Sequence, residues 1–337
     1  MITHLKSNLG ITIGDVNGIG PEVLLKTFAD QRLFELCIPV VYGSREVLRQ
    51  YAKILGIIDF NILGISNLTE VRENTLNVIE VQEKQIDISP GKPSLEGAAL
   101  AFSSMEKAAS DALEGHIDGI ITSPLNKKNI ESIHPDFTGH TSYFSLRAGN
   151  EAQMILASDK IKIAMVTGHV PIAKVSAMLS IEGIFNCIQT LSQSLTNDFA
   201  ITNPSIAVLG LNPHAGEEGL LGKEEQEVII PAIEMARSEK INCTGPLASD
   251  GFFGAGSYKK FDGILAMYHD QALIPFKTIS FDDGVNFSAN LSFVRTSPDH
   301  GTAYDIAGKG LASESSFKQS VYLAHTIWSR RTSHLDK

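Results

Sequence analysis

The 337-residue chain contains little cysteine, a single tryptophan, no long apolar run and no cluster of basic residues. Its cysteines, Cys37, Cys187 and Cys243, form no CxxC pair, which favours a reducing cytoplasm. No segment approaches the roughly 18 consecutive apolar residues of a membrane span, and the start of the chain lacks a signal peptide's apolar core. A net charge of −10 argues against nucleic acid as a partner. We therefore expect a cytoplasmic protein with neither membrane nor nucleic-acid partners.

The sequence does contain a regular alternation of short apolar runs and helical patterns. Strand-like runs lie at residues 10–13, 38–42, 77–81, 119–122, 161–166, 206–209 and 264–267, and helical patterns at residues 20–29, 44–55, 94–114 and 313–330. This alternation predicts βαβ units and a largely parallel sheet. Because the length exceeds that of a usual single core, we expect two α/β lobes with a cleft between them. We place the first lobe at residues 1–135 plus 300–337 and the second at residues 136–299.

Three histidines follow apolar runs at similar distances. His169, His214 and His269 each come a few residues after a run with the composition of a buried parallel strand. Ligands of open α/β sheets bind outside the carboxyl ends of strands, so the three imidazoles could converge there. Imidazole suits zinc and other first-row divalent ions, and three ligands leave positions open for substrate. Each histidine could instead cap a loop, but their equivalent placement makes a metal site an equal alternative.

Two further patterns concern anions. The glycine-rich loop at residues 14–22 is neither GxGxxG nor a P-loop, so it indicates a tight strand-to-helix turn more than a nucleotide site. Residues 138–141, Thr-Gly-His-Thr, precede a helical stretch and could bind an anion through helix-start N–H groups, with an ordinary N-cap as the alternative. Lys277, Asn286 and Arg295 are donors at regular spacing that could hold phosphate or carboxylate, although most such side chains are simply solvated.

Several motifs in a fixed order give the chain a specific resemblance. They are GDVNGIGPE at 14–22, FTGHT at 137–141, LNPHAGE at 211–217, GPL at 245–247 with Asp250, YHDQ at 268–271 and RTSPDHGTA at 295–303. With them the chain resembles the 4-hydroxythreonine-4-phosphate dehydrogenases of pyridoxal phosphate synthesis over nearly its whole length. The resemblance implies a homodimer of two-lobed α/β subunits, similar in fold to isocitrate and isopropylmalate dehydrogenases, with the active site in the inter-lobe cleft at the dimer interface.

The resemblance also implies roles for individual residues. His169, His214 and His269 would bind one divalent ion, Zn, Mg, Mn or Co, shared between subunits. The positions that match substrate-binding residues of the family are His140, Thr141, Lys277, Asn286 and Arg295. Asp250 and Asp270 match acidic positions beside the metal and are candidates for proton transfer, and Lys277 is a candidate for protonating an intermediate.

The implied reaction is oxidation of the C3 hydroxyl of 4-phosphooxy-L-threonine by NAD or NADP, followed by decarboxylation to 3-amino-2-oxopropyl phosphate. A metal chelated by that hydroxyl would lower its pKa and would then stabilise the enolate left by loss of carbon dioxide. The choice between NAD and NADP stays open, because no ribose-reading acidic residue occurs at Rossmann spacing.

Some positions depart from the family pattern. Ser142 stands where many members have Glu, residues 290–292 read Asn-Leu-Ser rather than Gly-Leu-Pro, and residues 122–127 read TSPLNK rather than TGPVHK. One alternative is therefore a dehydrogenase of another phosphorylated hydroxy acid, of the 4-phosphoerythronate or phosphothreonate type, or of a dihydrodiol dicarboxylate. An alternative of another class is a phosphate acyltransferase-like or non-catalytic binding protein. Protection by NAD or NADP against thermal unfolding would distinguish the dehydrogenases from that class.

Overall fold

The computed structural model describes residues 6–57, 61–83 and 86–335. Contacts divide the chain into two compact units, unit 1 (Met1–Ala152 with Leu291–Lys337) and unit 2 (Gln153–Asn290). Residues 136–152 and 291–299, which the sequence-based division put in the second lobe, belong to unit 1 by these contacts. The reason lies in the core, because Phe137, Phe144 and Phe293 are buried in one apolar cluster with unit 1 residues.

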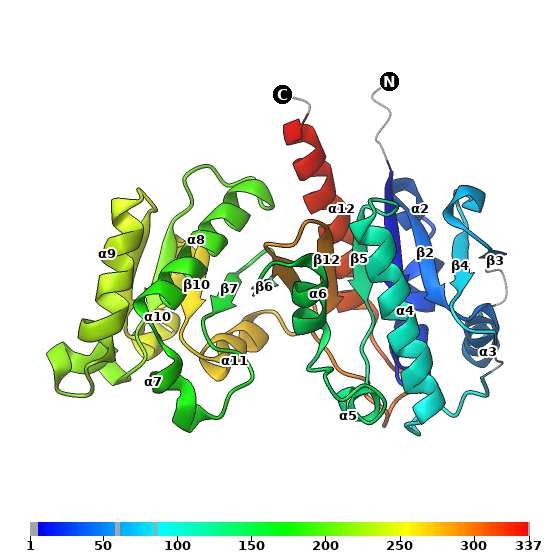
Figure 1. The fold of residues 1–337 in the computed structure, drawn as a ribbon, viewed down its shortest axis with the longest axis horizontal. Coiled ribbons are helices and arrows are strands. Elements are labelled where there is room, and N and C mark those ends of the chain that lie inside the picture. Colours follow the sequence, from blue (N-terminus) through cyan, green and yellow to red (C-terminus); the bar gives the residue numbers. More distant parts are fainter. Residues whose placement is uncertain (1–5, 58–60, 84–85, 336–337) are drawn as a thin grey trace. The chain divides into compact units, whose positions relative to one another are not determined.

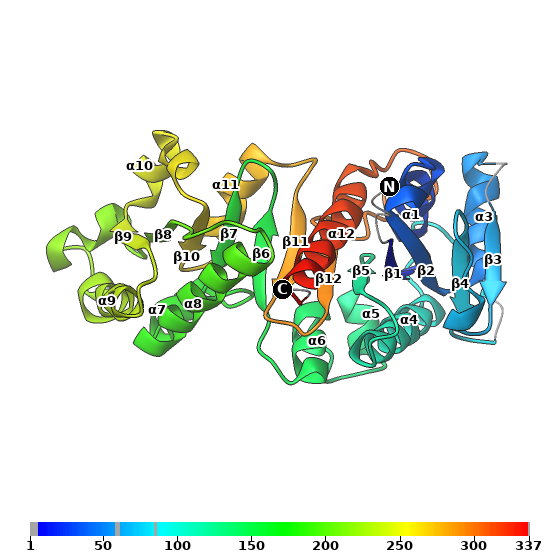
Figure 2. The same cartoon turned by 90° about the horizontal axis from the view of Figure 1, so that it is seen from above.

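Unit 1 is built on a parallel sheet (Figure 1). Its strands, in order across the sheet, are β3 (Ile62–Ile65), β4 (Leu76–Glu80), β2 (Cys37–Gly43), β1 (Ser7–Thr12), β5 (Gly119–Thr122) and β12 (Val294–Pro298). Each pairs in parallel with its neighbours within this set. The helical elements are α1 (Gly20–Ala29), α2 (Leu33–Leu36), α3 (Arg45–Leu55), η1 (Leu68–Glu70), α4 (Leu95–Leu113), α5 (Lys127–Glu131), α6 (His140–Ala148) and α12 (Ser315–Leu335). Helix α4 packs on one face of the sheet, and α1 and α12 lie on the other (Figure 2).

Unit 2 has a mixed sheet. Its strands, in order, are β11 (Val285–Ala289), β6 (Gln153–Ala157), β7 (Lys162–Met165), β10 (Gly263–Ala266), β8 (Ile206–Leu209) and β9 (Cys243–Leu247). The last four run parallel, whereas β6 is antiparallel to both β11 and β7. The helical elements are η2 (Ile172–Lys174), α7 (Val175–Met178), α8 (Ile181–Asn197), η3 (Pro213–Gly219), η4 (Glu225–Ile229), α9 (Ile230–Ser238), α10 (Ser249–Gly254), η5 (Ser257–Lys260) and α11 (His269–Ile279). Helices α8 and α11 pack on opposite faces of this sheet (Figure 2).

The predicted α/β class is confirmed, and the predicted strands reappear where the apolar runs are continuous. Strands β5, β8 and β10 are buried along their whole length, as expected of parallel strands covered on both faces. Helix α4 is preceded by its N-cap residue Ser94, whose Oγ accepts a hydrogen bond from the Gly97 N–H at 3.0 Å. No helix among the described residues is both long and apolar enough to span a bilayer.

The glycine-rich loop is a tight strand-to-helix turn. Gly14 has φ of 70°, and a Cβ there would lie 2.5 Å from the Pro124 carbonyl oxygen, so the position requires glycine. The buried Asp15 carboxylate accepts hydrogen bonds from the Asn17 N–H at 2.9 Å and the Tyr304 hydroxyl at 2.6 Å. Pro21 lies in the first turn of α1, as its fixed φ favours. The Asp15 side chain therefore stabilises the turn through hydrogen bonds.

Candidate active site

The three predicted metal ligands all lie beyond the carboxyl ends of adjacent parallel strands. In unit 2, β10 lies between β7 and β8. His169 follows β7, His269 is the first residue of α11 after β10, and His214 lies in η3 after β8. The rings of His169 and His269 have centroids 5.3 Å apart. The topology therefore brings at least two of the imidazoles together at one edge of the sheet.

A carboxylate orients one of these rings. His269 Nδ1 lies 2.7 Å from Asp270 Oδ1, and the ionised carboxylate can only accept, so Nδ1–H donates. This leaves Nε2 as the lone-pair nitrogen, and a carboxylate in this position fixes the tautomer of a metal-binding imidazole. About a third of the His269 side chain, 34%, is exposed. The donor chemistry fits a divalent first-row ion.

The three histidines do not form one close group in the described chain. Among the described residues, the ligand atoms of His169, His214 and His269 do not all lie within 4.8 Å of one another. His214 is exposed and has φ of 53°, inside a run of left-handed residues. The described chain thus brings His169 and His269 together without completing a three-histidine site by itself.

The other predicted residues of unit 2 lie on three elements. Asp250 is in the first turn of α10, Lys277 in the last turn of α11 and Asn286 on β11. The Asn286 Oδ1 atom is buried and accepts no hydrogen bond. A buried acceptor left in this state is costly, so it is a place where a ligand's donor would be favourable.

In unit 1, Arg295 is buried within the sheet. It lies on β12 with 2% of its surface exposed and donates to Thr122 Oγ1 from Nη2 at 2.6 Å and Nε at 3.2 Å. Burial lowers the pKa of Arg295 to about 9, which still leaves the guanidinium charged near neutral pH. The Phe144 ring lies 5.8 Å from the guanidinium carbon. A charge in so dry an environment attracts an anion more strongly than a surface arginine does.

His140 opens helix α6 beside this cation. Its Nε2 is buried and makes no hydrogen bond. Burial first, and then the charges of Arg295 and Lys127, hold the pKa of His140 well below its usual range. The N-cap residue of this helix is Gly139, so the start of α6 has no side-chain cap. Thr141, in the first turn, lines a surface depression of about 530 Å³.

Lys127 is a site residue that was not predicted from the sequence. A Cβ built on Gly139 would lie 3.3 Å from Lys127 Cε and 3.5 Å from Nζ, so the ammonium group lies beside the start of α6. The sequence does contain an indication of this role, because Lys127 is the last residue of the segment 122–127, in which the lysine matches the family pattern TGPVHK. Unit 1 therefore gathers Arg295, Lys127 and the start of α6 around His140, which is an arrangement suited to phosphate.

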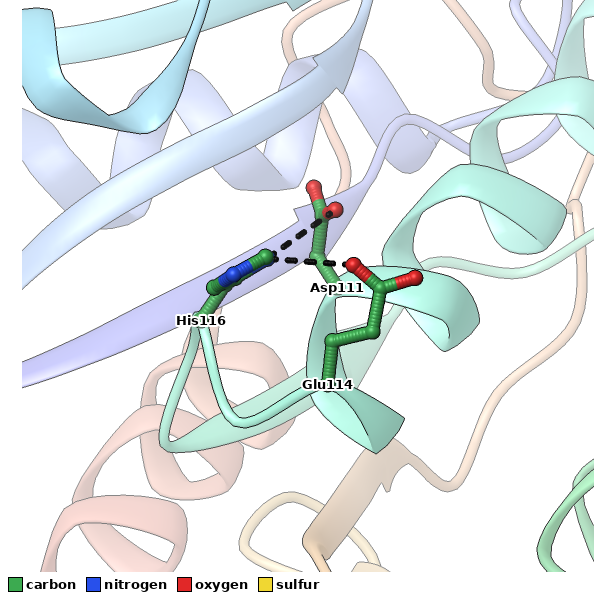
Figure 3. A group of neighbouring side chains, drawn as sticks. All are labelled: Asp111, Glu114 and His116. Carbon is green, nitrogen blue, oxygen red and sulfur yellow. Dashed lines mark ion pairs between the residues drawn. The ribbon is translucent and has the colours of Figure 1, made fainter.

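A further carboxylate and imidazole group lies away from these sites, at the end of α4. The ligand atoms of Asp111, Glu114 and His116 lie within 4.8 Å of one another (Figure 3). The buried Asp111 also accepts hydrogen bonds from Lys107 Nζ at 2.7 Å and from the Tyr42 hydroxyl at 2.8 Å. Because an ammonium group already neutralises this carboxylate, we interpret the cluster as an ion-pair network.

Comparison with known proteins identifies the family. The family model described as "Pyridoxal phosphate biosynthetic protein PdxA" matches residues 35–324. A protein from Bacteroides thetaiotaomicron named 4-hydroxythreonine-4-phosphate dehydrogenase is 46% identical, over 97% of this chain and 90% of its own. One of the same name from Prosthecochloris aestuarii is 41% identical, over 94% of this chain and 96% of its own.

Solved structures agree with the sequence relatives. The crystal structure of 4-hydroxythreonine-4-phosphate dehydrogenase from Klebsiella pneumoniae matches with a TM-score of 0.84 at 34% identity, covering 96% of this chain and 98% of that one. The resemblance inferred from the motifs is thereby confirmed. The chain belongs to the PdxA family of pyridoxal phosphate biosynthetic proteins.

Proposed function

We propose that this protein oxidises 4-phosphooxy-L-threonine at C3 with NAD or NADP and decarboxylates the product to 3-amino-2-oxopropyl phosphate, in pyridoxal phosphate biosynthesis. The relatives' shared name supports the substrate and the reaction type. The observation that carries the proposal is the pair His169 and His269 beyond the carboxyl ends of parallel strands, with Asp270 orienting one ring. In a metal-dependent hydroxy-acid dehydrogenase, metal-binding imidazoles of this kind are needed where the substrate hydroxyl binds.

The histidines would hold the metal. His169 and His269 supply two imidazoles, and His214 is the third ligand. The metal ion would be shared between the two subunits of a homodimer. A bound divalent ion would supply Lewis acidity, lowering the pKa of the substrate hydroxyl and stabilising negative charge on that oxygen during decarboxylation. Imidazole ligands tolerate zinc, cobalt or manganese, and magnesium stays open because substrate oxygens would complete the set.

The cations Arg295 and Lys127 of unit 1, together with the start of α6, would bind the phosphate. Arg295 offers a fork of N–H donors that matches phosphate oxygens, and His140 Nε2 is a buried nitrogen that lacks a partner. Thr141 adds a hydroxyl in the first turn of α6. Lys127 contributes positive charge beside the same helix start. These groups would bind the substrate dianion before and after reaction.

The remaining residues would handle protons and the amino group. Asp270 holds the His269 tautomer, and Asp250 is the second carboxylate available for proton transfer. Lys277 would protonate the carbanion that loss of carbon dioxide leaves. Asn286 Oδ1, which is buried without a donor, fits the substrate ammonium group.

Activity with a substrate panel tests this proposal. Purified protein with added metal is assayed for nicotinamide reduction with 4-phosphooxy-L-threonine, 4-phosphoerythronate, phosphothreonate and unphosphorylated 4-hydroxythreonine, with NAD and NADP in turn. We expect the highest kcat/KM for 4-phosphooxy-L-threonine and a large loss without the phosphate. A higher kcat/KM for either phosphorylated acid that lacks the amino group would refute the proposed substrate.

A further inference from the structure

The segment that carries His214 leaves its strand through one peptide group that two buried side chains hold. The carbonyl oxygen of Gly210 accepts a hydrogen bond from Gln271 Nε2 at 2.6 Å. The N–H of Leu211, in the same peptide group, donates to Glu225 Oε1 at 2.8 Å. Both side chains are nearly fully buried, with 8% of Gln271 and 2% of Glu225 exposed. The position and tilt of this peptide are thus determined from both sides.

Gln271 also connects this peptide with the segments of other predicted site residues. Its Oε1 accepts from the Met267 N–H at 2.6 Å, two residues before His269. Its Nε2 also donates to Ser249 Oγ at 2.7 Å, next to Asp250. The Met267 carbonyl in turn accepts from the Thr167 hydroxyl at 2.8 Å, two residues before His169. The Gln271 amide and the Thr167 hydroxyl together therefore link the chain segments of all three histidines.

Glu225 fixes the turn that follows. Its Oε1 also accepts from the Asn212 N–H at 2.7 Å, and its Oε2 from Asn212 Nδ2 at 2.9 Å. A Cβ on Gly216 would lie only 2.5 Å from Glu225 Oε2, so the carboxylate packs directly against the turn. Glu225 is the first residue of the π-helical turn η4, an irregularity that is frequent near functional sites.

The turn itself needs such support. His214, Ala215, Gly216, Glu217 and Glu218 all have positive φ, between 43° and 79°. Consecutive left-handed residues other than glycine are unfavourable and persist only when their surroundings determine them. The Gln226 amide adds a hydrogen bond to the Glu218 carbonyl at 2.8 Å. The direction of the His214 imidazole therefore depends on the hydrogen bonds that Glu225, Gln271 and Gln226 make to this segment.

We propose that Glu225 and Gln271 are positioning residues that orient His214 for metal binding by holding the Gly210–Leu211 peptide. The inference rests on the proposed function, because it requires His214 to be a ligand. Neither side chain contacts substrate or metal in this account. Both side chains act on the geometry of the left-handed turn. The loss of either would therefore weaken metal binding beyond what a control variant with a comparable loss of unfolding free energy shows.

Cobalt binding tests the proposal, with Co²⁺ as the probe because its visible spectrum reports the ligand set. Affinity is measured by titration of the metal-free protein for the wild type, Glu225→Gln and His214→Ala. Asp262→Asn is the matched control, since Asp262 likewise accepts a backbone N–H and a hydroxyl, from Ser205 at 2.8 and 2.7 Å, but at the opposite ends of β8 and β10. Urea unfolding of each variant gives the stability loss.

We expect Glu225→Gln to weaken Co²⁺ binding at least tenfold and to change the visible spectrum, whereas Asp262→Asn keeps both at a comparable loss of stability. Wild-type affinity and spectrum in Glu225→Gln, or equal weakening in the control, would overturn the inference. Wild-type binding in His214→Ala would overturn the proposed metal ligand and the inference with it. If Glu225→Gln does not fold, Gln271→Glu takes its place with the same expectations, because it removes the donor to Gly210 and Ser249 and keeps an acceptor for the Met267 N–H.

Discussion

Arg295 is the residue whose burial and charge most constrain the proposed chemistry. Arg295→Lys keeps a cation but loses the planar fork, and hydrogen bonds to charged groups contribute about 1.5–3 kcal/mol each. We expect KM for the phosphorylated substrate to rise about tenfold or more. Steady-state kinetics measure this, and Arg147→Lys, an exposed arginine of α6, is the control that should leave KM unchanged. Equal KM values in the wild type and Arg295→Lys would contradict phosphate binding by Arg295.

His140 predicts how stability depends on pH. Its pKa is lowered in the folded protein, first by burial and then by Arg295 and Lys127. Below the unfolded pKa of about 6.5, the unfolded chain binds a proton that the folded chain does not, so stability falls as pH falls. We expect His140→Asn to lose stability less steeply than the wild type between about pH 7 and pH 5. Urea unfolding across this range measures the difference, and parallel curves would show that burial of His140 does not shift its titration.

At the scale of elements, the start of α6 depends on Gly139. Its φ of 136° and ψ of 173° lie in a region that only glycine adopts readily, and a Cβ would press on Lys127. We expect Gly139→Ala to lower the free energy of unfolding by about 1–3 kcal/mol. The control is Gly254→Ala, where the backbone is ordinary and a Cβ would meet nothing within 4 Å. Thermal or urea unfolding decides, and equal stability of the two variants would refute the strain at Gly139.

Three of the predicted strands consist of continuous apolar residues, whereas β3, β6, β9, β11 and β12 were not predicted. Strands β5, β8 and β10 are of this kind, and helix α1 was predicted with its bounds. Strands β11 and β12 were missed because Asn286 and Arg295 stand where apolar side chains would have shown the pattern. The residues that supply binding groups thus interrupt the signal by which strands are recognised.

The site was only partly predictable for a similar reason. His169 and His269 were expected to converge because both follow parallel strands, and the structure places their rings side by side. Glu225 and Gln271 act on the backbone of residues far away in the sequence, so no local spacing marks them. The hydrogen bond from Gln271 to the Gly210 carbonyl can be recognised only once β8 and β10 are known to be adjacent strands.

At the scale of the whole molecule, nucleotide binding should be visible as stability. A ligand that binds only the folded state raises its stability, by about 2.7 kcal/mol at a hundredfold excess over Kd. We expect millimolar NAD or NADP, with metal and a substrate analogue present, to raise the melting temperature. Differential scanning fluorimetry measures the shift. No shift with either nucleotide would remove most support for a dehydrogenase and favour an acyltransferase-like or binding protein.

The central claim is a metal-dependent oxidative decarboxylation, and one measurement tests it most directly. Nicotinamide reduction and carbon dioxide release are followed together from 4-phosphooxy-L-threonine, in protein stripped of metal by a chelator and then reconstituted. We predict that stripped protein is inactive and that reconstituted protein forms reduced nicotinamide and carbon dioxide in equal amounts. Undiminished turnover by protein shown to be metal-free, or no turnover by folded, metal-loaded protein with either nucleotide, would contradict the account.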